Sequence, residues 1–450
     1  MEKKVFLVMA ALLLAVPVLR AGLLQDEIGG PEWLTYGAEV RVRQVGFNNI
    51  ITWDSDNKAD QQHFFRLRTR LFAGVNPIPE ISAYGRIINE WRYYVKHYDT
   101  AAGRWDNDSY SHPIRHEIIM DNAWIKLQDL GELPLEIRLG RQDILGQYGE
   151  GFLLMDGTPN DGSRSFYSDG VVVRIDPDET NQVDLIAFYN SQEQPFGIDL
   201  NDDFYQDDQP IGLYGAYWRN NGGLLADQAI EGYYLFKDGR DASWATLPEN
   251  QVHVIGTRFA GPVVDNISYA GEATLQLGEY DGNSMTAYGG YLRGTYTLAD
   301  LDCRPAFSLE YVHLSGDDPD KSKYSGWDPI MARWPKWSEL YIYSFLAENV
   351  AGSGERHIAY WTNTEIYRAR VTLQPIEKMS VDLVYQYLRA PRATGSGTGK
   401  NRGQNPQVVL RYNFTDWLSG HLWGEYFIPG NFHDGDDDGF FARWEMMARF

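Results

Sequence analysis

The chain ends in Phe440-Phe441-Ala442-Arg443-Trp444-Glu445-Met446-Met447-Ala448-Arg449-Phe450. Positions 442, 444, 446, 448 and 450 are all apolar, whereas arginine and glutamate fill three of the intervening positions. This period-two alternation is typical of a strand with one apolar and one polar face. It predicts the last strand of a transmembrane β-barrel, in which the apolar face meets lipid and the polar face lines the lumen.

The same alternation recurs upstream from about residue 34, in segments close to the length that a tilted strand needs to cross a bilayer. We count about eighteen segments, within about two, from 35–47 through 135–142, 267–280 and 407–412 to 440–450. Short connections such as 77–80 and 374–378 alternate with long polar ones such as 48–63, 143–167 and 316–360. The predicted fold class is therefore all-β: a transmembrane antiparallel β-barrel with short periplasmic turns and long extracellular loops. The 316–360 loop carries Trp327, Trp334 and Trp337 and is expected to fold partly into the barrel.

The first residues predict secretion. Lys3 and Lys4 precede an apolar run over 5–19, which is typical of a signal peptide and short for a membrane helix. We assign 1–22 to a signal peptide that is removed, and 23–450 to a single barrel domain in the bacterial outer membrane. The mean hydropathy of −0.42 does not oppose this, since lipid-facing and lumen-facing residues average out in a barrel.

Composition excludes several function classes. The formal charge of −22 argues against a nucleic-acid partner, and the single Cys303 cannot form an intrachain disulfide. The nine histidines are scattered, and no Gly-x-Ser-x-Gly elbow, Cys/His cluster or phosphate loop occurs. We therefore predict a protein that is not an enzyme and needs no cofactor.

Basic side chains gather on the predicted lumen face. In the first two strands Arg41 and Arg43 alternate with valines, and Arg66, Arg68 and Arg70 alternate with apolar residues and Thr69. An arginine facing lipid at mid-membrane would cost about 2–4 kcal/mol, so these side chains should point inward. The predicted pore lining is Arg41, Arg43, Arg66, Arg68, Arg70, Arg86, Arg92, Arg138, Arg174, Arg258, Arg293, Arg368, Arg370 and Arg411.

Two hypotheses explain these arginines. They could pair with carboxylates on adjacent strands and stiffen the wall, or their excess could attract an anionic solute. Guanidinium groups suit the second role because their rigid fork matches carboxylates and phosphates. Among the five arginines of the first two strands, Glu39 is the only acid, which favours an anion-selective patch.

An acidic segment near the C-terminus resembles a calcium loop in spacing. Residues 434–439 read Asp-Gly-Asp-Asp-Asp-Gly, and Glu445 stands at the twelfth position of an EF-hand pattern. An EF-hand is excluded because the following strand would carry Glu445 about 20 Å away. Asp434, Asp436 and Asp438 alone remain a tentative site for a structural Ca²⁺ ion in an extracellular loop, beside the alternative of a solvated acidic loop.

Three stretches resemble the central signature of the alginate export family of outer-membrane proteins. They are Gly140-Arg141-Gln142-Asp143, Tyr148-Gly149-Glu150-Gly151-Phe152-Leu153 and Ser163-Arg164-Ser165-Phe166-Tyr167-Ser168-Asp169-Gly170. The resemblance implies a monomeric barrel porin of eighteen strands with an arginine-rich pore, through which polyuronate chains leave the periplasm. By strict alternation Arg141 faces lipid, so we expect either a bulge near Gly140 or a position above the membrane.

These observations predict an outer-membrane channel that conducts an anionic solute, with export of an acidic, alginate-like polysaccharide as the preferred function. The alternative is a general diffusion porin without a dedicated substrate. The expected partners are anionic polysaccharide or small anions, outer-membrane lipid and lipopolysaccharide, and periplasmic export scaffold proteins.

Overall fold

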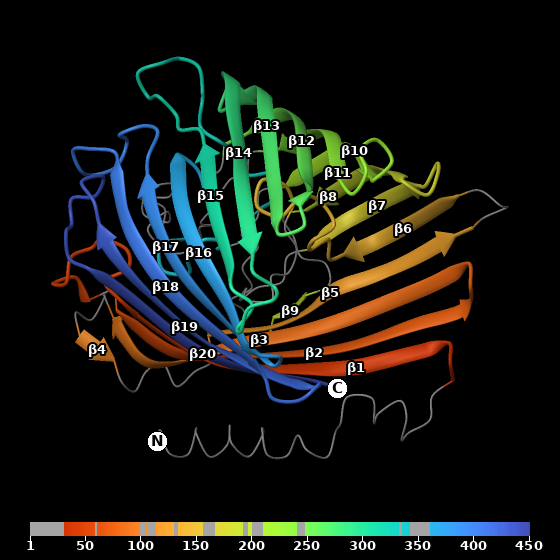
Figure 1. Cartoon of the computed structure of the whole chain (residues 1–450), viewed down its shortest axis with the longest axis horizontal. Coiled ribbons are helices and arrows are strands. Elements are labelled where there is room, and N and C mark those ends of the chain that lie inside the picture. Colours follow the sequence, from red (N-terminus) through yellow and green to blue (C-terminus); the bar gives the residue numbers. More distant parts are fainter. Residues whose placement is uncertain are drawn as a thin grey trace.

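Eighteen antiparallel strands close into one barrel in the computed structural model (Figure 1). The structure describes residues 31–58, 61–99, 104–106, 114–129, 134–155, 167–191, 197–199, 210–240, 248–332, 335–342 and 361–450. The wall strands are β1 (Leu34–Asn48), β2 (Gln62–Ile78), β3 (Ile81–Asp99), β5 (Ile114–Gln128), β6 (Leu135–Gln142), β7 (Ser168–Ile175), β8 (Asn181–Asn190), β10 (Ile211–Asn221), β11 (Ala229–Gly239), β12 (Asn250–Val264), β13 (Ile267–Tyr280), β14 (Asn283–Thr297), β15 (Ala306–Leu314), β16 (Thr364–Ile376), β17 (Met379–Arg389), β18 (Asn401–Asn413), β19 (Leu418–Pro429) and β20 (Gly439–Arg449). Two three-residue strands, β4 (Arg104–Asp106) and β9 (Gly197–Asp199), pair with β3 and β5 outside this cycle.

The first and last strands close the barrel. β1 pairs with β20 from Glu39 opposite Arg449 to Asn48 opposite Phe440, and the Phe450 amide donates to the Ala38 carbonyl at 2.8 Å. Each wall strand is thus bonded on both edges, and every predicted segment corresponds to one observed wall strand. The prediction of an all-β transmembrane barrel is confirmed.

Alternation along the strands separates two faces. Large apolar side chains such as Leu139, Leu309 and Leu422 are exposed on the outside, at 60%, 71% and 57%, whereas charged residues between them turn inward. This is the surface that a bilayer requires, because a closed barrel leaves no backbone polar group unpaired toward lipid. Among the described residues, no helix is long and apolar enough to cross a membrane.

The connections between strands alternate between short and long, as predicted. Short turns such as 79–80, 265–266 and 377–378 lie at one end of the barrel, and the strand ends that the long connections 143–167 and 315–363 join lie at the other. As expected, 281–282 is a short loop in a long-loop position. Residues 1–30, which include the predicted signal peptide, lie outside the described residues.

β18 begins earlier than predicted by more residues than any other wall strand does. β18 runs over Asn401–Asn413, whereas the alternation indicated only 407–412. Gly403 has a φ of +142° and Pro406 cannot donate to the ladder, so the first half of the strand lacks a readable period.

The barrel interior contains a packed apolar core formed by two loops. In the β6–β7 loop, Tyr148, Leu154 and Met155 are fully buried, and in the β15–β16 loop Trp327 and Trp337 are fully buried. The expectation that the β15–β16 loop folds inward is correct for these two tryptophans, whereas Trp334 lies outside the described residues.

The two loops pair with each other through their backbones. Leu154 and Ile330 form a parallel bridge, in which the Met155 amide donates to the Ile330 carbonyl at 2.7 Å. Wall side chains satisfy other buried loop carbonyls: Gln386 and Gln407 donate to the Trp337 carbonyl at 2.9 and 2.6 Å. Such pairing is what buried loop backbone requires.

Candidate functional site

The densest charge cluster of the lumen lies on β1, β2, β3 and β20. The β1–β2 register places Arg41 directly opposite Arg68 and Arg43 directly opposite Arg66, while Glu39 lies opposite Arg70. All five arginines are nearly buried, with exposures of 6% or less. Like charges directly opposite each other in a sheet are destabilising, so this arrangement needs anionic compensation.

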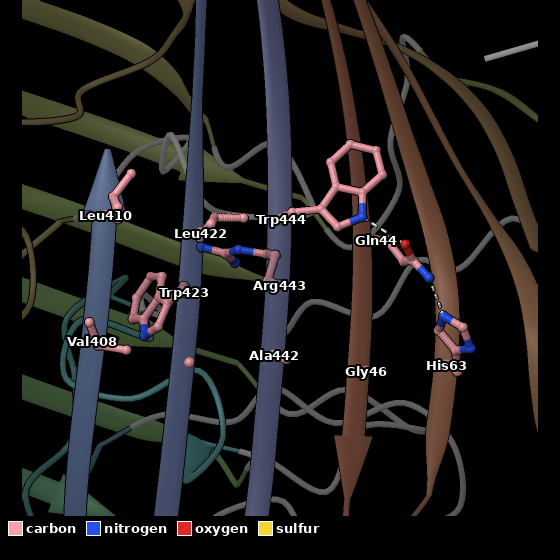
Figure 2. A pocket seen from close by; sticks show the side chains of 11 residues that line it. Gln44, Gly46, His63, Val408, Leu410, Leu422, Trp423, Ala442, Arg443 and Trp444 are labelled. Carbon is pink, nitrogen blue, oxygen red and sulfur yellow. Dashed lines mark hydrogen bonds between the residues drawn. The ribbon is translucent and has the colours of Figure 1, made fainter. Parts of the chain in front are cut away.

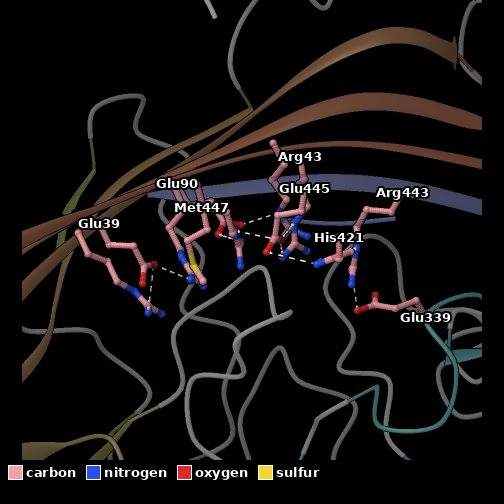
Figure 3. Close-up of polar contacts among 12 residues, drawn as sticks. Glu39, Arg43, Glu90, Glu339, His421, Arg443, Glu445 and Met447 are labelled. Atoms are coloured by element: carbon pink, nitrogen blue, oxygen red, sulfur yellow. Dashed lines mark hydrogen bonds and ion pairs between the residues drawn. The ribbon is translucent and has the colours of Figure 1, made fainter. Parts of the chain in front are cut away.

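Three glutamates supply compensation within the described residues (Figure 3). Glu445 of β20 accepts from Arg43 Nε at 2.9 Å, Glu90 of β3 accepts from Arg66 at 2.6 Å, and Glu39 accepts from Arg68 at 2.7 Å. We call these residues, Arg41, Arg43, Arg66, Arg68, Arg70, Glu39, Glu90 and Glu445, the arginine cluster. Alternation in the sequence predicts the five arginines of this cluster, but it identifies only Glu39 as an acid beside them. Glu90 and Glu445 belong to β3 and β20, which lie beside β2 and β1 only in the folded barrel.

Most other predicted pore arginines face the lumen in ion pairs with one or two acids, of which the shortest pair is given for each. The pairs are Arg86 with Asp121 (2.8 Å), Arg138 with Glu136 (3.1 Å), Arg174 with Asp184 (2.8 Å), Arg258 with Glu231 (2.6 Å), Arg293 with Glu150 (2.6 Å), Arg368 with Glu310 (3.2 Å) and Arg411 with Asp382 (2.6 Å). Arg370 lies on β16 with its buried Nε making no hydrogen bond to the described residues. The Arg92 side chain lies outside the described residues.

Several of these acids were missed at the sequence level. Asp184 and Glu231 lie directly opposite Arg174 and Arg258, so hairpin register would have found them. Asp121 is the extra residue of a bulge, where Arg86 pairs with Asn122 and Ile87 with Met120. Glu150 belongs to a loop, whose position no strand pattern predicts.

Glu150 connects both inner loops to the wall. Its carboxylate accepts from Arg293 of β14 at 2.6 and 2.9 Å and from Lys336 of the β15–β16 loop at 2.7 Å. Burial alone would raise the pKa of Glu150, but Lys336 and Arg293 outweigh it and hold that pKa well below its ordinary range. Burial lowers the pKa of Lys336, against the opposing influence of Glu150. Glu150 is therefore an anion that holds the inner loops in place.

The motif that resembles the alginate export signature occupies the start of this loop. Gly140 has a φ of +122°, and a Cβ there would lie 2.2 Å from the Ala123 carbonyl oxygen. The expected bulge at Gly140 is absent, because the β5–β6 register runs without a shift. Arg141 instead keeps its alternation at the outer end of β6, where Asp169 accepts from it at 2.7 Å and the Tyr167 ring lies 3.8 Å from its guanidinium carbon. These contacts leave Arg141 only 2% exposed.

The carboxylates of the acidic loop between β19 and β20 do not converge on one position. Asp434, Asp436 and Asp438 are exposed, and Tyr426 donates to Asp438. Within the part of the chain that the structure describes, no three His, Cys, Asp or Glu side chains form a group that could hold a metal ion. The Ca²⁺ site stays a prediction.

A closed barrel with a lipid-compatible outer face, a charged lumen and loops folded inside it is the architecture of an outer-membrane porin. The family model for alginate export matches residues 32–439, so the chain belongs to the alginate export family. The protein is thus a transport channel of the bacterial outer membrane. No curated protein matches the sequence.

Solved structures share the fold at low identity. OccK9 (OpdG) of Pseudomonas aeruginosa is 11% identical with a TM-score of 0.56, over 92% of this chain and 98% of that one. OpdK of the same species, solved with vanillate, is 11% identical with a TM-score of 0.54 over the same shares. OccAB4 of Acinetobacter baumannii is 11% identical with a TM-score of 0.53, over 94% and 100%.

Proposed function

We propose that this channel conducts an anionic solute, and that an acidic polysaccharide of the alginate type leaves the cell through it. One observation carries the proposal: on the luminal face Arg41 lies opposite Arg68, and Arg43 lies opposite Arg66. Adjacent guanidinium groups raise the positive electrostatic potential of this part of the lumen, and that potential attracts an anion that passes along the wall.

The chemistry of the cluster suits conduction better than tight capture. Each arginine already shares a glutamate, for example Arg41 with Glu90 at 3.2 Å. Because the five arginines are buried and already hold these partners, a uronate carboxylate is attracted by their charge and gains little net affinity. Weak attraction of this kind allows a polyanion to move on, as conduction requires. Membership of a family described by alginate export supports a polyuronate as the solute and outward movement as the direction.

A general diffusion porin is the second candidate, and the remaining arginines favour it. Away from the arginine cluster, Arg411 pairs with Asp382, and Arg86 pairs with both Asp121 and Asp143, so the basic residues of these pairs do not outnumber the acids. Pairs of this kind stiffen the wall and give no charge preference. The two functions therefore differ in whether the arginine cluster sets the selectivity.

The test is the reversal potential of the refolded barrel in a planar bilayer under a KCl gradient. We expect the wild-type channel to prefer anions, and the Arg66→Gln/Arg68→Gln/Arg70→Gln variant to lose most of that preference. The matched control, Arg174→Gln/Arg258→Gln/Arg411→Gln, neutralises three paired arginines elsewhere and should change it less.

Oligouronates added to the same bilayer identify the solute class. Block of the wild-type current at sub-millimolar oligouronate, lost in the Arg66/Arg68/Arg70 variant, is the expected result. Cation preference or equal behaviour of both triple variants would overturn the anion channel. Anion preference without oligouronate block would overturn the polysaccharide as its solute.

A further inference from the structure

The lipid-facing surface of the barrel carries a groove where the first and last strands meet (Figure 2). Its floor is a row of residues that lie directly opposite one another on five neighbouring strands. In order from β18 to β2 the row consists of Val408, Gly424, Ala442, Gly46 and His63. The three central positions carry at most a methyl group, so the surface is depressed across β19, β20 and β1. We call this depression the outer groove.

Large side chains border the outer groove on both sides. Toward the periplasm the next outward-facing row contains Leu410, Leu422 and Trp444. Toward the outside, Tyr426 and Phe440 lie opposite each other and are 42% and 47% exposed. The cavity over the floor and the periplasmic wall has a volume of about 530 Å³ and is lined mainly by apolar atoms, and Tyr426 and Phe440 lie outside its lining.

Polar groups at one end of the groove are bonded to one another. Trp444 Nε1 donates to Gln44 Oε1 at 2.6 Å, and Gln44 Nε2 lies 2.6 Å from His63 Nε2, as Figure 2 shows. The edge of the Phe65 ring faces Trp444 at a centroid distance of 6.5 Å. Polar side chains on a lipid-facing surface cost free energy unless they are hydrogen-bonded. The hydrogen-bonded series of Trp444, Gln44 and His63 therefore holds the wall of the groove in one position.

The groove descends from the outer rim into the membrane. His63 is one residue from the outer end of β2, and Gly46 is two from that of β1. At the other end, Val408 is seven residues from the outer end of β18. Four strand spacings of about 4.8 Å give the row a length of about 19 Å. The polar end of the groove lies near the lipid headgroups, and its apolar end lies deeper in the membrane. An acyl chain of an outer-leaflet lipid extends in the same direction, from the headgroup toward the membrane interior.

We propose that the outer groove binds one acyl chain of a lipopolysaccharide molecule. The groove is continuous with the surface that faces the membrane, and its position in the outer half directs it toward the leaflet that contains lipopolysaccharide. A peptide strand is a poor occupant because β18, β19, β20, β1 and β2 are already paired on both edges, which leaves no backbone groups for strand addition. The inference is independent of the proposed anion conduction.

The test is native mass spectrometry of the detergent-solubilised full barrel titrated with purified lipopolysaccharide, with phosphatidylethanolamine as the second probe. Gly46→Leu fills the groove, and Gly294→Leu is its matched control on another lipid-facing strand. In both positions a Cβ meets no atom within 4 Å and φ is not positive, so both variants should fold. We expect wild type and Gly294→Leu to retain one lipopolysaccharide, and Gly46→Leu to bind at least about tenfold more weakly, a change of about 1.4 kcal/mol.

A second measurement, photocrosslinking in cells, does not depend on whether the leucine variants fold equally well. A photoreactive benzoylphenylalanine at Ala442 should crosslink to lipopolysaccharide in cells, whereas the same group at Gly294 should not. Equal binding by Gly46→Leu and Gly294→Leu, or equal crosslinking at both positions, would overturn the site. Equal retention of phosphatidylethanolamine with the same Gly46→Leu sensitivity would overturn lipopolysaccharide as the occupant. We expect Gly46→Leu to keep the anion preference of the wild-type channel, so that its loss of lipopolysaccharide binding is not caused by a change in the channel.

Discussion

Glu150 and Lys336 form an ion pair of 2.7 Å inside the barrel, although 186 positions separate them in the chain. Each belongs to a different extracellular loop, so the pair joins the two loops that fill the lumen. The Lys336 ammonium also lies 3.9 Å from the centre of the Phe152 ring, within the same apolar core. The width of the channel thus depends on contacts between loops as well as on the number of wall strands.

Replacing Glu150 should widen the channel. Glu150→Gln leaves Lys336 and Arg293 without their shared carboxylate, and breaking a buried ion pair costs about 3–5 kcal/mol. We expect larger and noisier single-channel conductance in a planar bilayer. Glu136→Gln, which removes a carboxylate from a more exposed wall pair with Arg138, is the control and should conduct as wild type does. Identical conductance in both variants would show that the inner loops do not depend on Glu150.

Replacing Glu445 should change charge preference and stability together. Glu445→Gln removes the carboxylate that forms an ion pair with Arg43 at 2.6 Å across the β1–β20 seam. The anion preference should rise, because the lumen loses a negative charge, and the unfolding temperature seen by gel mobility of heated samples should fall. The Arg43→Gln/Glu445→Gln double variant should recover part of the lost stability, since it leaves no buried charge from this pair. A double variant as unstable as Glu445→Gln would argue against the pair.

The loop between β19 and β20 should loosen in acid. Burial, and secondly the nearby Arg402 guanidinium, lower the pKa of His433 from 6.5 to about 3. The undocked loop binds a proton below about pH 6.5 and the docked loop only near pH 3, so docking is stable above this window and weakens as pH falls through it. The protection factors of residues 430–438 in hydrogen exchange, which are corrected for the intrinsic pH dependence of the amide exchange rate, should therefore fall as pH is lowered between these values.

His433→Phe is the matched variant for this pH effect. It keeps an aromatic ring beside Trp53 and Tyr341, whose ring centroids lie 5.6 and 5.9 Å from that of His433, but it cannot be protonated. Its protection factors should be flat over the same pH range. An equal acid-induced fall of the protection factors in His433→Phe would assign the effect to another group.

Gly140 should be intolerant of any side chain. Gly140→Ala introduces a Cβ 2.2 Å from the Ala123 carbonyl oxygen at a φ of +122°, and residues held in such backbone regions cost about 1–3 kcal/mol. We expect a lower refolding yield in detergent. Gly85→Ala is the control, because a Cβ at Gly85 meets no atom within 4 Å. Equal yields would mean that the β5–β6 hairpin adjusts to the extra atom.

The strands were predictable because alternate residues of each strand face lipid and lumen, and the two environments select apolar and polar side chains respectively. The predicted segments 135–142 and 267–280 coincide with β6 and β13 to the residue. Alternation fails where Gly403 and Pro406 interrupt it, and the start of β18 was missed there. The pattern is strongest where lipid and lumen differ most.

The site was predictable only in part, since charge balance depends on which strands and loops become neighbours. Alternation placed Arg41 and Arg43 on one face, but Glu90 and Glu445 come from strands far away in the sequence. Glu150 comes from a loop, and its partners Arg293 and Lys336 are 143 and 186 positions away. The outer groove was invisible because it arises from the register of five strands.

The seam between β1 and β20 has a consequence for biogenesis. Both the arginine cluster and the outer groove cross this seam, so each is assembled from the two ends of the chain. In a barrel that has inserted but not yet closed, the arginine cluster lacks Glu445, and the outer groove is divided between β18–β20 and β1–β2. Both are therefore completed at the same moment, when the final strand pairs with the first.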